Sequence, residues 1–125
     1  MTRIFVTLFL ISAIPAYGYQ ARNGQTVTPR GAQDFVVEQR NGAAVRAYWC
    51  AAAEYAQREL GAGFSTRVYR ASEPPRRRGE AIAFTLDPAR RASASGLVVL
   101  NDDGGLSVNH GLFFCRLEAR RDNGN

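Results

Sequence analysis

The stretch AYWCAAAEYAQRELGAG, Ala47–Gly63, predicts the central element of the fold. It is rich in alanine, which has the highest helix propensity, and no proline or glycine occurs over 45–60. We therefore expect an α-helix over 45–60 that ends at Gly61. Its apolar residues recur at helical spacing and form one stripe: Trp49, Ala53, Ala56 and Leu60. Such a stripe has to be buried against another layer of the domain.

Several short segments around this helix are β-prone and end at turn residues, as strands do. They are 35–37, 66–71, 80–87, 97–100 and 106–117, with a five-residue hairpin connection, NDDGG, at 101–105. One helix among strands that follow each other as hairpins indicates an α+β domain. We expect one main α-helix packed on a small antiparallel sheet of about four or five strands, with one disulfide.

The first 18 residues have the pattern of a secretory signal peptide. Arg3 provides the positively charged N-terminal region, an apolar run covers 4–14, and Ala16-Tyr17-Gly18 resembles a signal-peptidase cleavage site. The apolar run has about 11 residues, whereas a helix that spans a bilayer needs about 20. We therefore expect cleavage after Gly18 and a periplasmic or secreted protein with no membrane span in its mature form.

The mature chain is predicted to form a single domain. Residues 19–33 are polar and rich in turn residues, which predicts a flexible N-terminal arm with a short strand at 25–28. Residues 34–118 contain the predicted helix and the other strands, and form the expected α+β domain. The charged segment 119–125 is expected to be a disordered tail.

The chain has two cysteines, Cys50 and Cys115. In an oxidising compartment an even number of cysteines is typical of disulfide pairing. A bridge would join the predicted helix to the predicted final strand and close a loop of about 65 residues. The alternative is a reactive thiol at a helix N-terminus. The spacing is not Cys-x-x-Cys, and Cys115 lies in the apolar run LFFCRL, so a structural disulfide is favoured.

All basic residues are arginine, and the formal net charge is +5. Two clusters in predicted loops form a candidate anion-binding site: Arg76, Arg77, Arg78, Arg90 and Arg91. Guanidinium groups bind phosphate and carboxylate in a bidentate manner, so a convergent patch would attract an anionic surface or an acidic protein. Nucleic acid is a less available anion outside the cell. A solvated surface with no partner is the alternative.

His110 is the only histidine in the sequence. Across the predicted hairpin it could form an acid–base pair with Asp102 or Asp103, as a small secreted hydrolase would require. The alternative is an exposed histidine at the end of a strand. Few metal-binding residues remain once the cysteines pair, and NDDGG lacks the spacing of a calcium loop. We expect no metal and no cofactor.

One part of the sequence resembles small exported proteins of Gram-negative bacteria that have no assigned function. The resemblance rests on YWCAA at 48–52, YA at 55–56, RVY at 67–69 and FTLDP at 84–88. It implies export and a shared small fold, and it implies no activity or functional residue.

These patterns favour a non-enzymatic exported protein with a binding or accessory function in the periplasm. A hydrolase that uses His110 is one alternative. Another is an inhibitor of a secreted enzyme, which needs a protruding rigid loop, and the sequence offers Ser72–Gly79 as the candidate.

Overall fold

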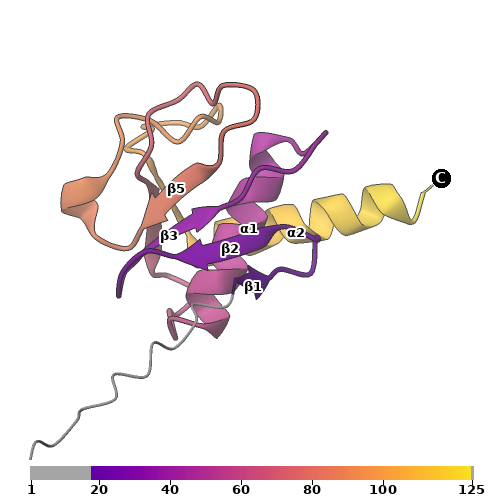
Figure 1. Ribbon diagram of the computed structural model, residues 1–125, viewed down its shortest axis with the longest axis horizontal. Helices are drawn as coiled ribbons and strands as arrows, with labels where there is room; N and C mark the ends of the chain where they lie inside the picture. Colours follow the sequence, from indigo (N-terminus) through magenta and orange to yellow (C-terminus); the bar gives the residue numbers. More distant parts are fainter. Residues whose placement is uncertain (1–17, 125) are drawn as a thin grey trace, which may run out of the picture.

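The computed structural model describes residues 18–124, which form a six-stranded antiparallel sheet and two α-helices (Figure 1). The helices are α1 (Val45–Arg58) and α2 (Val108–Asp122), and a short 3₁₀ helix, η1, covers Pro88–Arg90. The strands run in the order β1-β2-β3-β5-β4-β6. Their bounds are β1 (Tyr19–Gln20), β2 (Thr26–Pro29), β3 (Asp34–Val37), β4 (Arg67–Arg70), β5 (Ile82–Thr85) and β6 (Gly105–Ser107). The predicted α+β class is confirmed, with more strands than expected. The predicted signal peptide lies outside the described residues except for Gly18.

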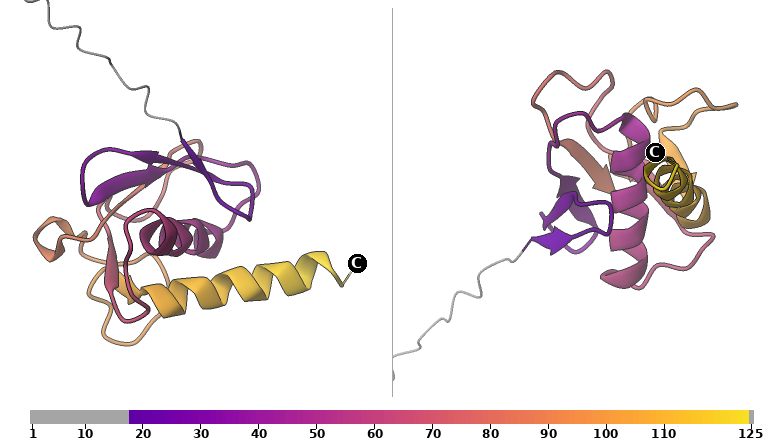
Figure 2. Two further views of the ribbon diagram at one scale, coloured as in Figure 1. Left: turned by 90° about the horizontal axis from the view of Figure 1, so that it is seen from below. Right: turned by 90° about the vertical axis from the view of Figure 1, so that its right-hand side faces the viewer.

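Helix α1 lies at the centre of the molecule, between the strands and α2 (Figure 2). Every residue from Ala47 to Ala56 is buried, so the helix is covered on all sides and not on one stripe alone. The Trp49 ring packs edge-on against Phe84 of β5, with ring centroids 4.9 Å apart. The predicted helix is confirmed. Its small side chains allow two layers to approach it at once.

The structure corrects the predicted final strand, 106–117, because only Gly105–Ser107 is β-strand and the chain then enters α2. The Ser107 hydroxyl accepts a hydrogen bond from the backbone N–H of His110 at 3.1 Å, which is an N-cap interaction. A short apolar run such as GLFFC does not separate a strand from a buried helix by periodicity. The capping serine was the local signal for the helix.

Three smaller expectations also need correction. The arm predicted over 19–33 contributes β1 and β2 to the sheet, and its expected short strand corresponds to β2. The segment 97–100 is not a strand, so NDDGG at 101–105 does not connect a hairpin. The tail predicted from residue 119 is helical as far as Asp122.

Gly111 lies at a close contact between the two helices. A Cβ atom at this position would lie 2.5 Å from the Ala53 Cβ and 3.0 Å from the Trp49 carbonyl oxygen. The absence of a side chain at this glycine allows the α2 backbone to pack directly on α1.

The predicted disulfide, Cys50–Cys115, is confirmed, with Cα atoms 5.0 Å apart. Because residue 115 is helical, the bridge joins α1 to α2 and not a helix to a strand. It links segments 65 residues apart in sequence, and so restricts the unfolded chain strongly.

We expect the paired substitution Cys50→Ala and Cys115→Ala to lower the free energy of unfolding by up to about 4 kcal/mol, because the loop closed by the bridge is long. Urea unfolding of the oxidised wild type and of this variant measures the difference. Equal stabilities, or two free thiols in the oxidised wild type by mass spectrometry, would contradict the role assigned to the bridge.

We expect Gly111→Ala to destabilise the protein by about 1–3 kcal/mol, because overpacking at the helix contact outweighs the gain in helix propensity. Gly63→Ala is the matched control, since its nearest contact would be an ordinary 3.9 Å from the Thr66 hydroxyl. Thermal unfolding of both variants tests this. A Gly111→Ala variant as stable as the control would refute the close contact.

Candidate functional site

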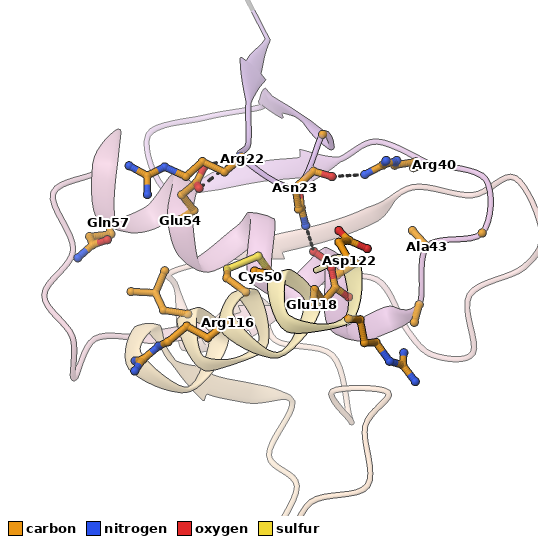
Figure 3. Close-up of a pocket in the computed structure, with 18 of the residues that line it drawn as sticks. Arg22, Asn23, Arg40, Ala43, Cys50, Glu54, Gln57, Arg116, Glu118 and Asp122 are labelled. Carbon is orange, nitrogen blue, oxygen red and sulfur yellow. Dashed lines mark hydrogen bonds between the residues drawn. A yellow bond between two sulfur atoms is a disulfide. The ribbon is translucent and has the colours of Figure 1, made fainter. Parts of the chain in front are cut away.

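A groove of about 960 Å³ lies beside the two helices (Figure 3). Four segments form its walls: the turn at 22–24, the loop at 40–44, one side of α1, and α2 from Leu112 onward. We call it the helix groove. Its lining includes both cysteines, small apolar residues and several charged side chains, so it is an amphipathic surface and not a dry cavity.

The disulfide and the small residues next to it form the apolar part of the helix groove. Cys50 is buried in α1, and Cys115 is half-buried in α2. Ala47 and Leu112 line the groove beside them. Because the sulfur atoms are joined, no thiol is available there for nucleophilic or redox chemistry.

Glu54 is a buried acid in the wall of the groove, and the N-terminal strand region satisfies it. Its carboxylate accepts a hydrogen bond from the Tyr19 hydroxyl at 2.7 Å and from the backbone N–H of Arg22 at 3.2 Å. Burial, together with this hydrogen bond and the charge of Glu54, raises the pKa of Tyr19 to about 12. The acid therefore ties β1 and the turn that follows it to α1.

Five arginines line the groove, and none has a carboxylate within ion-pair distance among residues 18–124: Arg22, Arg40, Arg58, Arg116 and Arg121. Arg22, Arg58 and Arg116 are exposed and belong to different segments of the chain. Arg40 donates a hydrogen bond to the Asn23 carbonyl oxygen, and Arg121 lies on α2 beside Glu118 and Asp122. The groove thus carries guanidinium groups whose charge is not neutralised by direct contact with an acid.

Besides Glu54, the groove has two acidic residues toward the C-terminal end of α2. Glu118 and Asp122 are one helical turn apart there (Figure 3). Burial, assisted by the charge of Asp122, raises the pKa of Glu118 above its usual value. This end of the groove therefore carries two acids beside Arg121, whereas Glu54 lies in the wall formed by α1.

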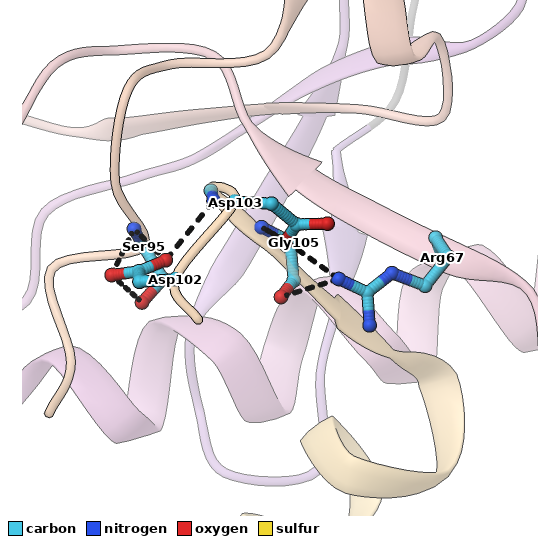
Figure 4. A network of polar contacts seen from close by, with 6 residues as sticks. Arg67, Ser95, Asp102, Asp103 and Gly105 are labelled. Atoms are coloured by element: carbon cyan, nitrogen blue, oxygen red, sulfur yellow. Dashed lines mark hydrogen bonds and ion pairs between the residues drawn. The ribbon is translucent and has the colours of Figure 1, made fainter. Parts of the chain in front are cut away.

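The structure does not bring the predicted acid–base pair together. His110 is exposed in the first turn of α2, where its ring lies 5.1 Å from that of Phe114. Asp103 forms an ion pair with Arg67 at 2.6 Å, and Asp102 accepts hydrogen bonds from Ser95 and Gly104 (Figure 4). No hydrogen bond or ion pair joins His110 to either aspartate in the described structure.

The Asp102 carboxylate holds together the loop between Ser95 and Gly104. Burial acts to raise its pKa, but hydrogen bonds from Gly104 and Ser95 outweigh burial and hold the pKa below its usual value. The carboxylate therefore stays charged and fully engaged at neutral pH, which is unsuitable for a general base.

The predicted arginine clusters lie at opposite ends of β5, since 76–78 precedes this strand and 90–91 follows it. The Arg76 guanidinium stacks on the Tyr48 ring, 5.0 Å from its centroid. Arg90 pairs with Asp34 and with Asp87. Two of the five arginines are thus occupied within the fold, and Arg77, Arg78 and Arg91 are exposed.

The helix groove was not predicted from the sequence. Three of its arginines come from positions 22, 58 and 116, which no local pattern connects. Only the correct placement of α2 beside α1 brings them to one surface, and that helix was predicted as a strand. No sequence signal singled out these three residues among the many arginines.

Two further features bear on the kinds of site this fold offers. Across residues 18–124, no three His, Cys, Asp or Glu side chains gather closely enough to hold a metal ion. None of the helices seen there combines the length and apolarity that crossing a bilayer demands.

We expect the Tyr19–Glu54 contact to make stability fall in alkaline solution. The folded phenol titrates at about 12 and the unfolded one near 10, so the contribution is complete below pH 10 and is lost as the pH rises to 12. Tyr19→Phe should flatten this decline. Free energies of unfolding between pH 9 and about 12 measure it, and parallel profiles for both proteins would rule out the effect.

Comparison with known proteins gives no family for this chain. It matches no protein-family model, and no curated protein or solved structure is significantly similar to it. The resemblance to exported Gram-negative proteins remains a prediction.

Proposed function

We propose that this is an exported binding protein, without enzymatic activity, that holds an acidic segment of a partner protein in the helix groove. The observation that carries the proposal is the set of unpaired guanidinium groups of Arg22, Arg58 and Arg116 around one concave, partly apolar surface. Arginine is suited to carboxylate recognition because its planar fork forms two parallel hydrogen bonds.

The shape of the groove supports an extended ligand. Its walls come from both helices and from two loops, so a bound chain would contact several segments at once. The disulfide fixes α2 on α1, which keeps the arginines in place before binding and reduces the entropy lost when the ligand binds. The apolar surface near the bridge would accommodate aliphatic parts of the ligand.

The exposed arginine loop at 76–78 is the rival anion-binding surface. One of its three guanidinium groups already stacks on the Tyr48 ring. An anion bound there would be surrounded by water, which weakens charge interactions. The groove therefore provides the better-defined site for the anionic partner inferred from the sequence.

The proposal predicts different effects for two variants that lose equal charge. Arg22→Ala, Arg58→Ala and Arg116→Ala together should weaken binding of a fluorescent polyglutamate peptide at least about tenfold, a loss of about 1.4 kcal/mol. Arg76→Ala, Arg77→Ala and Arg78→Ala together should weaken it far less. Fluorescence anisotropy at about 0.15 M salt measures both, because this salt concentration screens general charge attraction.

The two triple variants distinguish a specific binding site in the groove from general attraction by the protein's net charge. Equal losses would show that only net charge matters, and a greater loss in the loop variant would move the site to 76–78. Either result, or no binding by the wild type, would refute the groove as the anion site. Circular dichroism of each variant confirms that the fold is retained.

A further inference from the structure

A second surface lies on the side of the molecule that α2 covers. Figure 2 shows the layers in the order sheet, α1, α2, with the loops 61–66 and 96–101 reaching outward near the start of α2. A hydrogen bond at 2.9 Å, from the Asn109 backbone N–H to the Phe64 carbonyl oxygen, joins the first loop to this helix. The second loop ends shortly before β6, which leads directly into α2. We call these two loops and the outward side of α2 the α2 face.

Large apolar side chains are exposed on all three segments of the α2 face. Phe64 is 61% exposed in the first loop, and Val98 and Leu100 are almost completely exposed in the second. Phe113 of α2 is 48% exposed. These four are the large apolar side chains that the fold leaves exposed within residues 18–124, and all of them belong to this side of the molecule. Such a concentration of exposed apolar side chains indicates an interaction surface.

The charged side chains on the outward side of α2 are arginines. The two loops of the α2 face contain no charged residue. On the helix, Arg116 and Arg120 follow Phe113 at helical spacing, and all three side chains are exposed. The acids of this helix, Glu118 and Asp122, line the helix groove instead. The α2 face is therefore both apolar and positively charged.

The fold engages the acids that lie next to the second loop. Asp103 forms an ion pair with Arg67 at 2.6 Å (Figure 4). The carboxylates of Asp102 and Glu73 accept hydrogen bonds from backbone N–H groups. Their charges are thus balanced in part by local partners, which reduces their repulsion of an anion bound at the α2 face.

We propose that the α2 face binds the surface of an anionic phospholipid bilayer. The apolar side chains of the two loops and of Phe113 enter the boundary between headgroups and acyl chains, and Arg116 and Arg120 contact lipid phosphates. Aromatic and aliphatic side chains next to arginines are typical of protein surfaces that lie on a membrane. The positive charge of the face complements the negative charge of the lipid.

The arrangement of the apolar side chains favours lipid over a protein partner. They project from two loops and one helix, and a fluid bilayer accommodates separate projections without fitted pockets. A protein partner would need pockets for all four side chains and acids placed opposite Arg116 and Arg120. The charge of the face and the spacing of its apolar side chains are thus both explained by one anionic, deformable surface.

Sedimentation with lipid vesicles tests the proposal. The wild type should bind vesicles of equal parts phosphatidylcholine and phosphatidylglycerol at least about tenfold more tightly than vesicles of phosphatidylcholine alone. Val98→Gln with Leu100→Gln should weaken binding to the mixed vesicles at least about tenfold, because the loop loses its apolar side chains while the charge of the protein is unchanged.

A matched pair of variants tests the contribution of arginine. Arg120→Gln should weaken binding to the mixed vesicles about fivefold, because each arginine near an anionic membrane adds to the attraction. Arg30→Gln removes the same charge from the exposed turn between β2 and β3, on the sheet side, and should leave binding nearly unchanged. Arg120 lies outside the lining of the helix groove, so this test is independent of peptide binding there.

Four results would overturn the proposal: no binding to the mixed vesicles, equal binding to both kinds of vesicle, unchanged binding by the double variant, or equal losses from the two arginine variants. Sedimentation of the protein alone identifies another occupant. If the wild type self-associates, the double variant does not, and neither binds vesicles, the α2 face docks on a second copy instead. Because Val98 and Leu100 are exposed, the double variant should unfold at the wild-type temperature, which confirms that it is folded.

Discussion

The close packing of α2 on α1 determines the position of the helix groove. Gly111 lies against Ala53, and the disulfide joins Cys50 to Cys115 about one helical turn further along α2. A small domain buries a limited share of its surface, so a covalent link between two layers contributes a large part of its stability. Helix α1 consequently has protein on every side, and its alanines are required for close contact as well as for helix propensity.

The helix groove is a direct consequence of this packing. Because α2 is fixed beside α1, it cannot close over the turn at 22–24, and the space between them remains open. The Tyr19–Glu54 hydrogen bond holds the opposite wall from the side of the sheet. Two connections, one covalent and one polar, thus keep the arginines of three distant segments around the same surface.

Sequence patterns predicted the elements that depend on local chemistry. Helix propensity predicted the helix at 45–60, and the alternation of apolar and polar side chains predicted the strands that became β4 and β5. The disulfide was predicted from the even number of cysteines and the expected oxidising compartment. The segment 106–117 was misassigned because its aromatic residues favour strand and its helical period is short. Ser107 as N-cap was a local signal for the helix, whereas Gly111 as a contact point has meaning only with α1 in place. The groove could not be predicted, since it depends on that misassigned helix.

The arginines of this chain show why net charge alone does not identify a binding surface. Arg70 is buried and bonds to the carbonyl oxygens of Ser72 and Ser95, so it holds two loops together. Arg67 and Arg90 form ion pairs, and Arg76 stacks on an aromatic ring. An arginine with these contacts is part of the fold, and binding an anion there would mean breaking them. An anionic partner would therefore bind best to guanidinium groups that form no ion pair or stacking contact within the fold. Such groups lie together in the helix groove, beside the disulfide.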